Sequence, residues 1–209
     1  MEKRLIVYDF ETTGFTHSYP VQIGIMVIEK DGTSNTYMNY IQCEMPIEPG
    51  AYRIHKISEA KVKALGKIRE DVMEVLNKLI NQPDTIVIGH NILGHDNAVL
   101  NKFFKEYGYQ ELPDSDCFDT SAQMKMEMLG WEKPFEESWG DFHQRNMRKK
   151  AKGLKHSMEE ALRYYKIPFD PNRLHDAKYD VECNYQVFLK QIEAISDKYG
   201  EASIVEFLS

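Results

Sequence analysis

The hydrophobic positions in the first part of the chain fall into short runs that are typical of strands. Three such runs come before residue 43, and the Asp31-Gly32 pair between the second and the third is a strong hairpin signal, so an antiparallel meander opens the chain. A buried strand is predicted by the apolar run at 85–89, and a shorter one by Cys117-Phe118. The expected strands cover residues 5–8, 21–29, 33–42, 85–89 and 117–118.

Later segments carry the spacing of amphipathic helices. Between residues 68 and 80 the apolar positions recur every three or four residues, and Pro83 ends that helix shortly afterwards. Ser157 and Glu160 form a capping box that predicts the start of another helix. Further helices are expected at about 99–107, 120–129, 157–165 and from 176 onward.

The resulting order, β-β-β-α-β-α-β-α-α, fits an α/β fold in which a mixed sheet carries helices on its faces. The 209 residues predict a single domain, 1–209. Residues from about 130 to 153 show no clean period, and we interpret them as an irregular basic insertion.

Composition narrows the class of protein. Hydrophobic residues are 42% and charged residues 28% of the chain, which argues against disorder, and no apolar run approaches the ~18–20 residues of a membrane helix. The N-terminus shows no signal peptide. The three cysteines, Cys43, Cys117 and Cys183, have no C-x-x-C spacing, which favours a reducing, intracellular, cytoplasmic location over a disulfide scaffold or a cysteine zinc site.

Net charge does not exclude a nucleic-acid partner. The 26 basic and 33 acidic residues give −7, but the segment 145–155 contains six basic residues and no acidic one. Such a run is either a solvated surface segment or a track for a phosphate backbone, with Trp131, Trp139 and Phe142 nearby as candidates for stacking on bases. The six are Arg145, Arg148, Lys149, Lys150, Lys152 and Lys155.

Four carboxylates and one imidazole follow predicted strands or begin predicted helices. Asp9 and Glu11 are one residue apart at a strand end, so both point to the same side of the sheet. Asp96 comes just after the buried strand at 85–89, and His175 and Asp180 lie at the start of the last helix. Each residue alone is typical of a solvated surface, whereas together they offer oxygen ligands for divalent cations. A transition-metal site at His90, His95 and Asp96 has no supporting zinc motif.

Three segments, 8–14 (YDFETTG), 89–96 and 175–180, resemble in order the three motifs of the DnaQ-like, DEDDh 3′-5′ exonucleases. Ile54-His55-Lys56-Ile57-Ser58 is similar to the family's H-G-I-[ST] segment, and Asp119-Thr120 to its D-T pair before a helix. The histidine lies five residues before the last aspartate, which matches the histidine branch of the superfamily. The resemblance implies an RNase H-like fold, a five-stranded mixed sheet with an antiparallel meander plus parallel strands, flanked by helices.

The resemblance also implies roles for individual residues. Two Mg²⁺ ions, for which Mn²⁺ would substitute, would be held by the four carboxylates, and His175 would be the general base of a two-metal hydrolysis of phosphodiester bonds. The product would be nucleoside 5′-monophosphates from the 3′ ends of single-stranded DNA or RNA. The carboxylates are Asp9, Glu11, Asp96 and Asp180, and the expected substrate contacts are Thr12, His55, Asn91, Arg145, Lys149, Lys150 and Lys152.

Departures from the family pattern leave the substrate open. Lys56 replaces the usual glycine, and the segment 91–96 has the spacing of oligoribonuclease. One alternative is therefore an oligoribonuclease-like or RNase T-like RNA-trimming enzyme instead of a DNA proofreading or repair nuclease. A second is a catalytically silent nucleic-acid-binding protein of the same fold. No polymerase or replication partner is evident, since no long tail follows the last helix, and the oligomeric state, a homodimer included, stays open.

Overall fold

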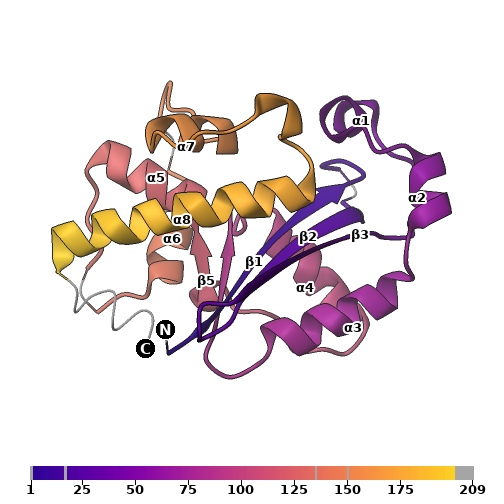
Figure 1. The fold of residues 1–209 in the computed structure, drawn as a ribbon, viewed down its shortest axis with the longest axis horizontal. Coiled ribbons are helices and arrows are strands. Elements are labelled where there is room, and N and C mark those ends of the chain that lie inside the picture. The colour runs from indigo at the N-terminus through magenta and orange to yellow at the C-terminus, as the bar shows by residue number, and fades with distance from the viewer. Residues whose placement is uncertain (1, 17, 135, 150, 201–209) are drawn as a thin grey trace.

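A computed structural model describes residues 2–16, 18–134, 136–149 and 151–200. Five strands form one sheet in the order β3-β2-β1-β4-β5 (Figure 1). Strands β1, β2 and β3 are antiparallel neighbours, while β4 pairs parallel with both β1 and β5. The five-stranded mixed sheet is therefore confirmed. The strands are β1 (Arg4–Thr12), β2 (Pro20–Ile28), β3 (Ser34–Tyr40), β4 (Thr85–Gly89) and β5 (Cys117–Asp119).

Helices cover both faces of this sheet (Figure 1). Alternation along β1 sends Ile6 and Tyr8 into one core with α3 and α4, and Leu5 and Val7 into another with α5, α6 and α8. The helices are α1 (Pro49–His55), α2 (Glu59–Leu65), α3 (Arg69–Ile80), α4 (Asp96–Glu106), α5 (Thr120–Leu129), α6 (Trp139–Met147), α7 (Met158–Tyr164) and α8 (Ala177–Tyr199), with short 3-10 turns at Asp114–Asp116 and Pro171–Arg173. Asp9 and Glu11, in the same alternation as Leu5 and Val7, face the α8 side.

Helix α8 begins in direct contact with the backbone of β2. A Cβ atom on Gly24 would lie 2.0 Å from the carbonyl oxygen of Ala177, so only glycine allows this approach. Two residues earlier, the Gln22 side-chain oxygen accepts a hydrogen bond from the Ala177 N–H (3.4 Å). Gly24 is paired with Asp9 and Gln22 with Glu11 across the β1–β2 ladder. The start of α8 is therefore anchored opposite the two carboxylates of β1.

The expectation that residues 130–153 are irregular is wrong over 139–147, which form α6. Ser138 caps this helix by accepting the Asp141 N–H, and Trp139, Phe142 and His143 are buried in the core. The hydropathy pattern does not predict α6, because His143, which lies on the buried face of this helix, is polar. Inside the core the Asp119 N–H donates to Nδ1 of His143 (3.3 Å). Burial also removes Trp139 and Phe142 from the candidates for stacking on bases.

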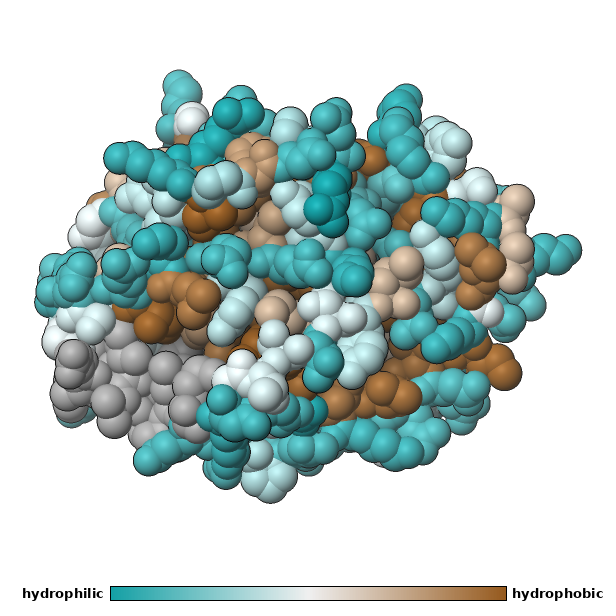
Figure 2. Space-filling model, in the orientation of Figure 1, coloured by the Kyte–Doolittle hydropathy of each residue, from teal (hydrophilic) through white to brown (hydrophobic). Residues whose placement is uncertain are grey.

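The sequence pattern also did not predict the short helices α1 and α2. Each has seven residues and buries a single side chain, so neither produces a hydrophobic period. On the face drawn in Figure 2, hydrophilic residues separate the hydrophobic ones over most of the surface. None of the helices in the described ranges is both long and apolar enough to cross a membrane.

Candidate active site

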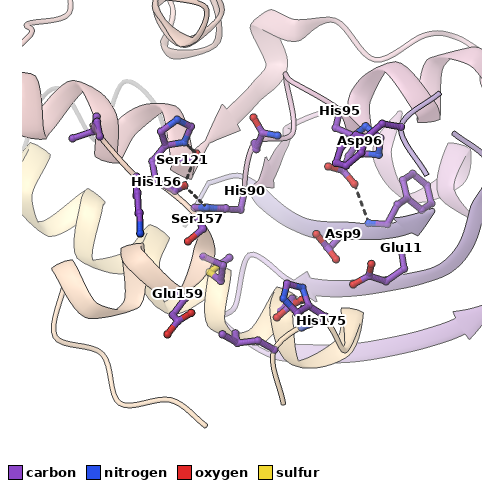
Figure 3. A pocket seen from close by; sticks show the side chains of 18 residues that line it. Asp9, Glu11, His90, His95, Asp96, Ser121, His156, Ser157, Glu159 and His175 are labelled. Atoms are coloured by element: carbon purple, nitrogen blue, oxygen red, sulfur yellow. Dashed lines mark hydrogen bonds between the residues drawn. The ribbon is translucent and has the colours of Figure 1, made fainter. Parts of the chain in front are cut away.

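The four predicted carboxylates and His175 line one cavity of about 720 Å³ (Figure 3). Three parts of the fold bring them together. Asp9 and Glu11 come from β1, Asp96 is the first residue of α4, and Asp180 lies in the first turn of α8. The sequence therefore predicted correctly that Asp9 and Glu11 face the same side and that Asp96 lies near them. The prediction rested on alternation in β1 and on the position of Asp96 just beyond a buried strand.

Hydrogen bonds orient two of the carboxylates. Oδ1 of Asp96 accepts the Phe10 N–H (3.0 Å), which ties α4 to β1. Oδ2 of Asp180 accepts the His175 N–H (3.0 Å), while its Oδ1 is buried and has no hydrogen-bond partner among the described residues. A buried carboxylate oxygen without a donor is costly unless a cation pairs with it. This oxygen therefore fits a metal ligand.

The donor atoms are also close enough to share an ion. Ligand atoms of Glu11, His175 and Asp180 all lie within 4.8 Å of one another. Carboxylate oxygens are the ligands that Mg²⁺ and Mn²⁺ prefer. The carboxylates of Glu11 and Asp180 therefore fit a divalent cation, and the His175 imidazole lies beside them.

Burial and mutual repulsion raise the carboxyl pKa values at this site. Burial alone raises the pKa of Asp9 to about 6. Burial and then the negative charge of Asp9 raise the pKa of Asp180 to about 8, and they raise the pKa of Glu11 still further. The pKa of Asp96 also lies well above its ordinary value, from burial and from Asp9. Bound cations would offset this repulsion and return the groups to the ionised form.

His175 stands in the loop before α8, with a backbone φ of 69° in the left-handed region. Partial burial lowers the pKa of its imidazole, although the negative charge of Glu159 acts in the opposite direction. A neutral imidazole at the edge of a carboxylate cluster is chemically able to accept a proton from water.

The loop between β4 and α4 is held by Asp119, whose side chain is completely buried. Its Oδ1 accepts the Asn91 N–H (3.0 Å) and its Oδ2 accepts the Leu93 N–H (3.1 Å). The same Oδ1 accepts the Ala122 N–H (2.9 Å) and so caps α5. The D-T pair seen in the sequence thus supports the segment that leads to Asp96.

Among the expected substrate contacts, Asn91 lines the cavity, whereas Thr12 and His55 do not. Both ring nitrogens of His55 bond to backbone: Nε2 donates to the Thr12 carbonyl oxygen (3.2 Å), and Nδ1 accepts the Ile57 N–H (3.0 Å). Thr12 is buried at the end of β1. In this structure both residues support the end of the strand that carries Glu11.

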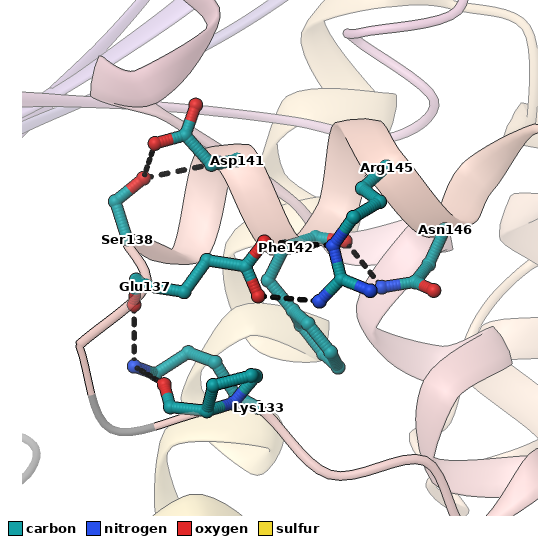
Figure 4. A network of polar contacts seen from close by, with 8 residues as sticks. Lys133, Glu137, Ser138, Asp141, Phe142, Arg145 and Asn146 are labelled. Carbon is teal, nitrogen blue, oxygen red and sulfur yellow. Dashed lines mark hydrogen bonds and ion pairs between the residues drawn. The ribbon is translucent and has the colours of Figure 1, made fainter.

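Three basic residues of the insertion that the structure describes, Arg145, Lys149 and Lys152, stand outside the lining of the cavity. Arg145 pairs with Glu137, with its Nε 2.8 Å from Oε1 (Figure 4). The Lys149 ammonium lies 5.1 Å from the centre of the Trp131 ring, and Lys152 is exposed. None of these three lines the cavity, and Lys150 lies outside the described residues. Lys155, from the same basic run, does line it.

Several lining residues were not expected from the sequence. Phe15, which is 84% exposed, contacts the His95 ring edge to face with 5.6 Å between ring centres. At the other end, the Ser121 hydroxyl lies 2.6 Å from Nδ1 of His156. Phe15 could have been predicted from its position directly after Glu11-Thr12-Thr13-Gly14, whereas Ser121 and His156 stand in no motif.

Comparisons with known proteins identify relatives of this chain in sequence and in fold. One curated relative is the PolC-type DNA polymerase III of Mycoplasma genitalium, which is 24% identical over 187 residues, 88% of this chain and 11% of the polymerase. E. coli Exonuclease I in complex with a dT13 oligonucleotide superposes with a TM-score of 0.72 at 20% identity, over 96% of this chain and 43% of that one. Its apo form matches with a TM-score of 0.72 at 18% identity, over 97% of this chain and 44% of that one.

The chain thus spans less than half the length of Exonuclease I and about a ninth of the polymerase. These solved structures establish the RNase H-like fold that the sequence resemblance implied. The sequence model of the RNase T exonuclease family matches residues 6–188, nearly the whole described chain. The chain therefore belongs to the RNase T family of exonucleases, within the DnaQ-like branch of the RNase H-like superfamily.

Proposed function

We propose that this chain is a metal-dependent 3′-5′ exonuclease that hydrolyses the terminal phosphodiester bond of single-stranded nucleic acid and releases nucleoside 5′-monophosphates. The observation that carries the proposal is the convergence of Asp9, Glu11, Asp96, Asp180 and His175 on one cavity. Four carboxylates with raised pKa values in a shared site need cationic partners. Mg²⁺ fits the oxygen-rich set, and Mn²⁺ is its expected substitute.

The chain's own residues would divide the work as follows. The carboxylates would hold two divalent cations, which supply electrostatic stabilisation to the attacking and leaving oxygens of an in-line displacement. His175 would take a proton from the attacking water, and its neutral form is favoured by the lowered pKa. The hydrogen bond from the His175 N–H to Asp180 keeps this base beside the cluster.

Single-stranded ends are the favoured substrate. Similar Exonuclease I structures were solved in complex with dT13 and dA16 oligonucleotides, and we extend that kind of ligand to this chain. Phe15 is an exposed aromatic ring next to the carboxylates, and such rings stack on unpaired bases. The spacing of segment 91–96 keeps RNA trimming as the second candidate, because it is the spacing of oligoribonuclease.

The proposal is tested with 5′-labelled DNA and RNA oligonucleotides of several lengths, incubated with MgCl₂, MnCl₂ or EDTA. We expect ladders that shorten from the 3′ end, release of mononucleotides and no reaction in EDTA. The matched control is Asp180→Asn, which removes one negative charge at nearly constant shape. The ratio of the DNA and RNA rates decides between the two candidate substrates.

Other outcomes would contradict the proposal. Early release of the 5′ label as a mononucleotide would reverse the polarity, and cleavage of circular single-stranded DNA would indicate an endonuclease. A protein that binds the oligonucleotides but leaves them intact with either metal would be the catalytically silent alternative.

A further inference from the structure

The cavity extends well beyond the carboxylates. At one end His95 lies beside Asp96, while Ser121 and His156 lie at the opposite end (Figure 3). Phe15 contacts the His95 ring, and Lys155, the residue before His156, also lines the cavity. A volume of about 720 Å³ lies in the upper half of the ~300–1,000 Å³ range of pockets for drug-sized ligands, which leaves room for more than one nucleotide. The cavity therefore continues past the carboxylate cluster toward Ser121 and His156.

Hydrogen bonds hold the backbone before and after the segment 151–155, which precedes the Ser121 and His156 end of the cavity. At the C-terminal end of α6, the Lys125 ammonium donates to the carbonyl oxygens of Asn146 (3.3 Å) and Met147 (2.7 Å) and also to that of Lys149. At the start of α7, the carbonyl oxygen of His156 accepts from Nε2 of His90 (2.9 Å) and from the hydroxyl of Ser121 (2.9 Å).

Among the described basic residues of 145–155, Lys155 alone lines the cavity. Lys155 is exposed, lines the cavity and has no ion-pair partner in the described ranges. Glu159, an acidic residue at the same end, is already paired with Arg163 (2.7 Å). Lys155 therefore brings an uncompensated positive charge to this end of a cavity whose other charges are mostly carboxylates.

We propose that this end of the cavity binds the nucleotide immediately upstream of the terminal one, as an extension of the function proposed above. The Lys155 ammonium pairs with the phosphodiester on the upstream side, and the base lies against the imidazole of His156. The short contact between the Ser121 hydroxyl and Nδ1 of His156 (2.6 Å) holds that ring in place for stacking. Terminal and upstream nucleotides thus occupy opposite ends, on either side of the scissile bond.

The test compares two substrates that differ only upstream. One is the p-nitrophenyl ester of a nucleoside 5′-monophosphate, which has a cleavable phosphodiester but no upstream nucleotide. The other is a single-stranded pentamer of the sugar type that the wild type degrades faster. The variants are Lys155→Gln and, as a matched control from the same segment, Lys152→Gln, whose parent residue is exposed and does not line the cavity.

We expect Lys155→Gln to raise KM for the pentamer about tenfold, as expected for losing one charged hydrogen bond, with kcat nearly unchanged. The same variant is expected to leave KM for the ester unchanged, and Lys152→Gln to match wild type on both substrates. Pentamer binding is also measured by fluorescence anisotropy at several salt concentrations in the Asp180→Asn background. Adding Lys155→Gln to this background is expected to reduce the slope of log affinity against log salt concentration by about 0.7. His156→Ala is expected to weaken pentamer binding and His156→Phe to restore it.

Two results separate failure of this inference from failure of the proposed function. A wild-type protein that hydrolyses neither substrate contradicts the exonuclease function itself. If the wild type is active, Lys155→Gln decides the second question. A variant whose KM is unchanged for both the pentamer and the ester, or changed equally for both, overturns the upstream subsite but not the exonuclease function.

Discussion

Among the described residues, the Asp180 side chain accepts one hydrogen bond and has one buried oxygen without a donor, and the other three carboxylates line the same cavity. We expect Asp180→Asn to lower kcat by ~10²-fold or more, because in the proposed function the carboxylates act as a unit in holding the ions. Glu11→Gln, Asp9→Asn and Asp96→Asn are expected to do the same. Turnover is measured on an end-labelled oligonucleotide at saturating metal, and near-normal turnover in any of the four variants would remove that residue from the set of ligands.

His175 has a testable role that differs from that of the carboxylates. We expect His175→Ala to lower kcat by ~10²–10⁴-fold, the range for losing a general base, while metal affinity is largely retained. Because its pKa is lowered, the imidazole remains a neutral base below pH 6.5, so the wild-type rate should fall only at more acidic pH. A pH–rate profile with the same acid limb in wild type and variant would exclude His175 as the base.

The backbone conformation at Lys56 explains why the family usually has glycine at this position. It occupies the C-cap of α1 with a φ of 58°, in the left-handed region where side chains are unfavourable. We expect Lys56→Gly to stabilise the protein by up to about 1 kcal/mol, since relief of this strain exceeds the added entropy of the unfolded chain. Thermal melts of both proteins test this, and a lower Tm in the variant would show that the lysine side chain makes a stabilising contact.

Among the elements, α8 depends most on a close backbone contact. Gly24→Ala must push Ala177 outward, and we expect it to displace Asp180 from Asp9 and to cost about 1–3 kcal/mol from overpacking. The activity loss should be accompanied by a weaker apparent affinity for Mn²⁺, measured by titration of activity against metal. Gly50→Ala, at a position with open space around its Cβ, is the matched control. Equal metal affinity in both variants would show that α8 tolerates the shift.

The strands and the longer helices were predictable because their hydrophobic period is strong. The period in 68–80 predicted α3, and alternation in β1 predicted that Asp9 and Glu11 face the same side. Helix α6 could not be predicted this way, since its buried face includes the polar residue His143, whose ring nitrogens bond to Asp119 and to Gln123. Burial lowers the pKa of His143 to about 3, so the ring stays neutral and acts as a core residue.

At the scale of the whole molecule, the carboxylate cluster makes stability depend on pH. The pKa values of Asp9, about 6, and Asp180, about 8, lie above those of the unfolded chain, so the folded state binds more protons in this window. Burial lowers the pKa values of several histidines, which act in the opposite direction below about pH 6.5. Above pH 7 these histidines are neutral in both states, so stability falls as pH rises when no metal is present. We expect Tm in EDTA to decrease over pH 7–8.5 and MgCl₂ to raise Tm more at the alkaline end.

The matched control for this pH dependence is Asp180→Asn, which should flatten the slope in EDTA because one member of the repelling cluster is gone. A Tm in EDTA that rises with pH over this range would contradict the repulsion argument. Both measurements use the complete chain, since the ligands come from β1, α4 and α8.

The family and the metal-ligand candidates could be predicted because their residues stand in compact motifs. The substrate contacts could not, since side-chain reach depends on tertiary hydrogen bonds. Arg145 belongs to the basic run that was expected to contact the substrate, yet it is paired with Glu137 (Figure 4). Lys155, ten residues further along the same run, lines the cavity instead, and the sequence spacing does not distinguish the two residues.

The position of β1 in the sheet has a consequence for motion. This strand is paired on both sides, with β2 and with β4, so its amide protons should be among the slowest to exchange with solvent. His175 instead stands in a connecting loop, where exchange is governed by small local openings. The carboxylates on β1 are therefore expected in the last part of the molecule to open, and His175 in a part that opens at lower cost. Under the proposed function, this division would keep the ion site rigid while the base exchanges protons with bulk water between turnovers.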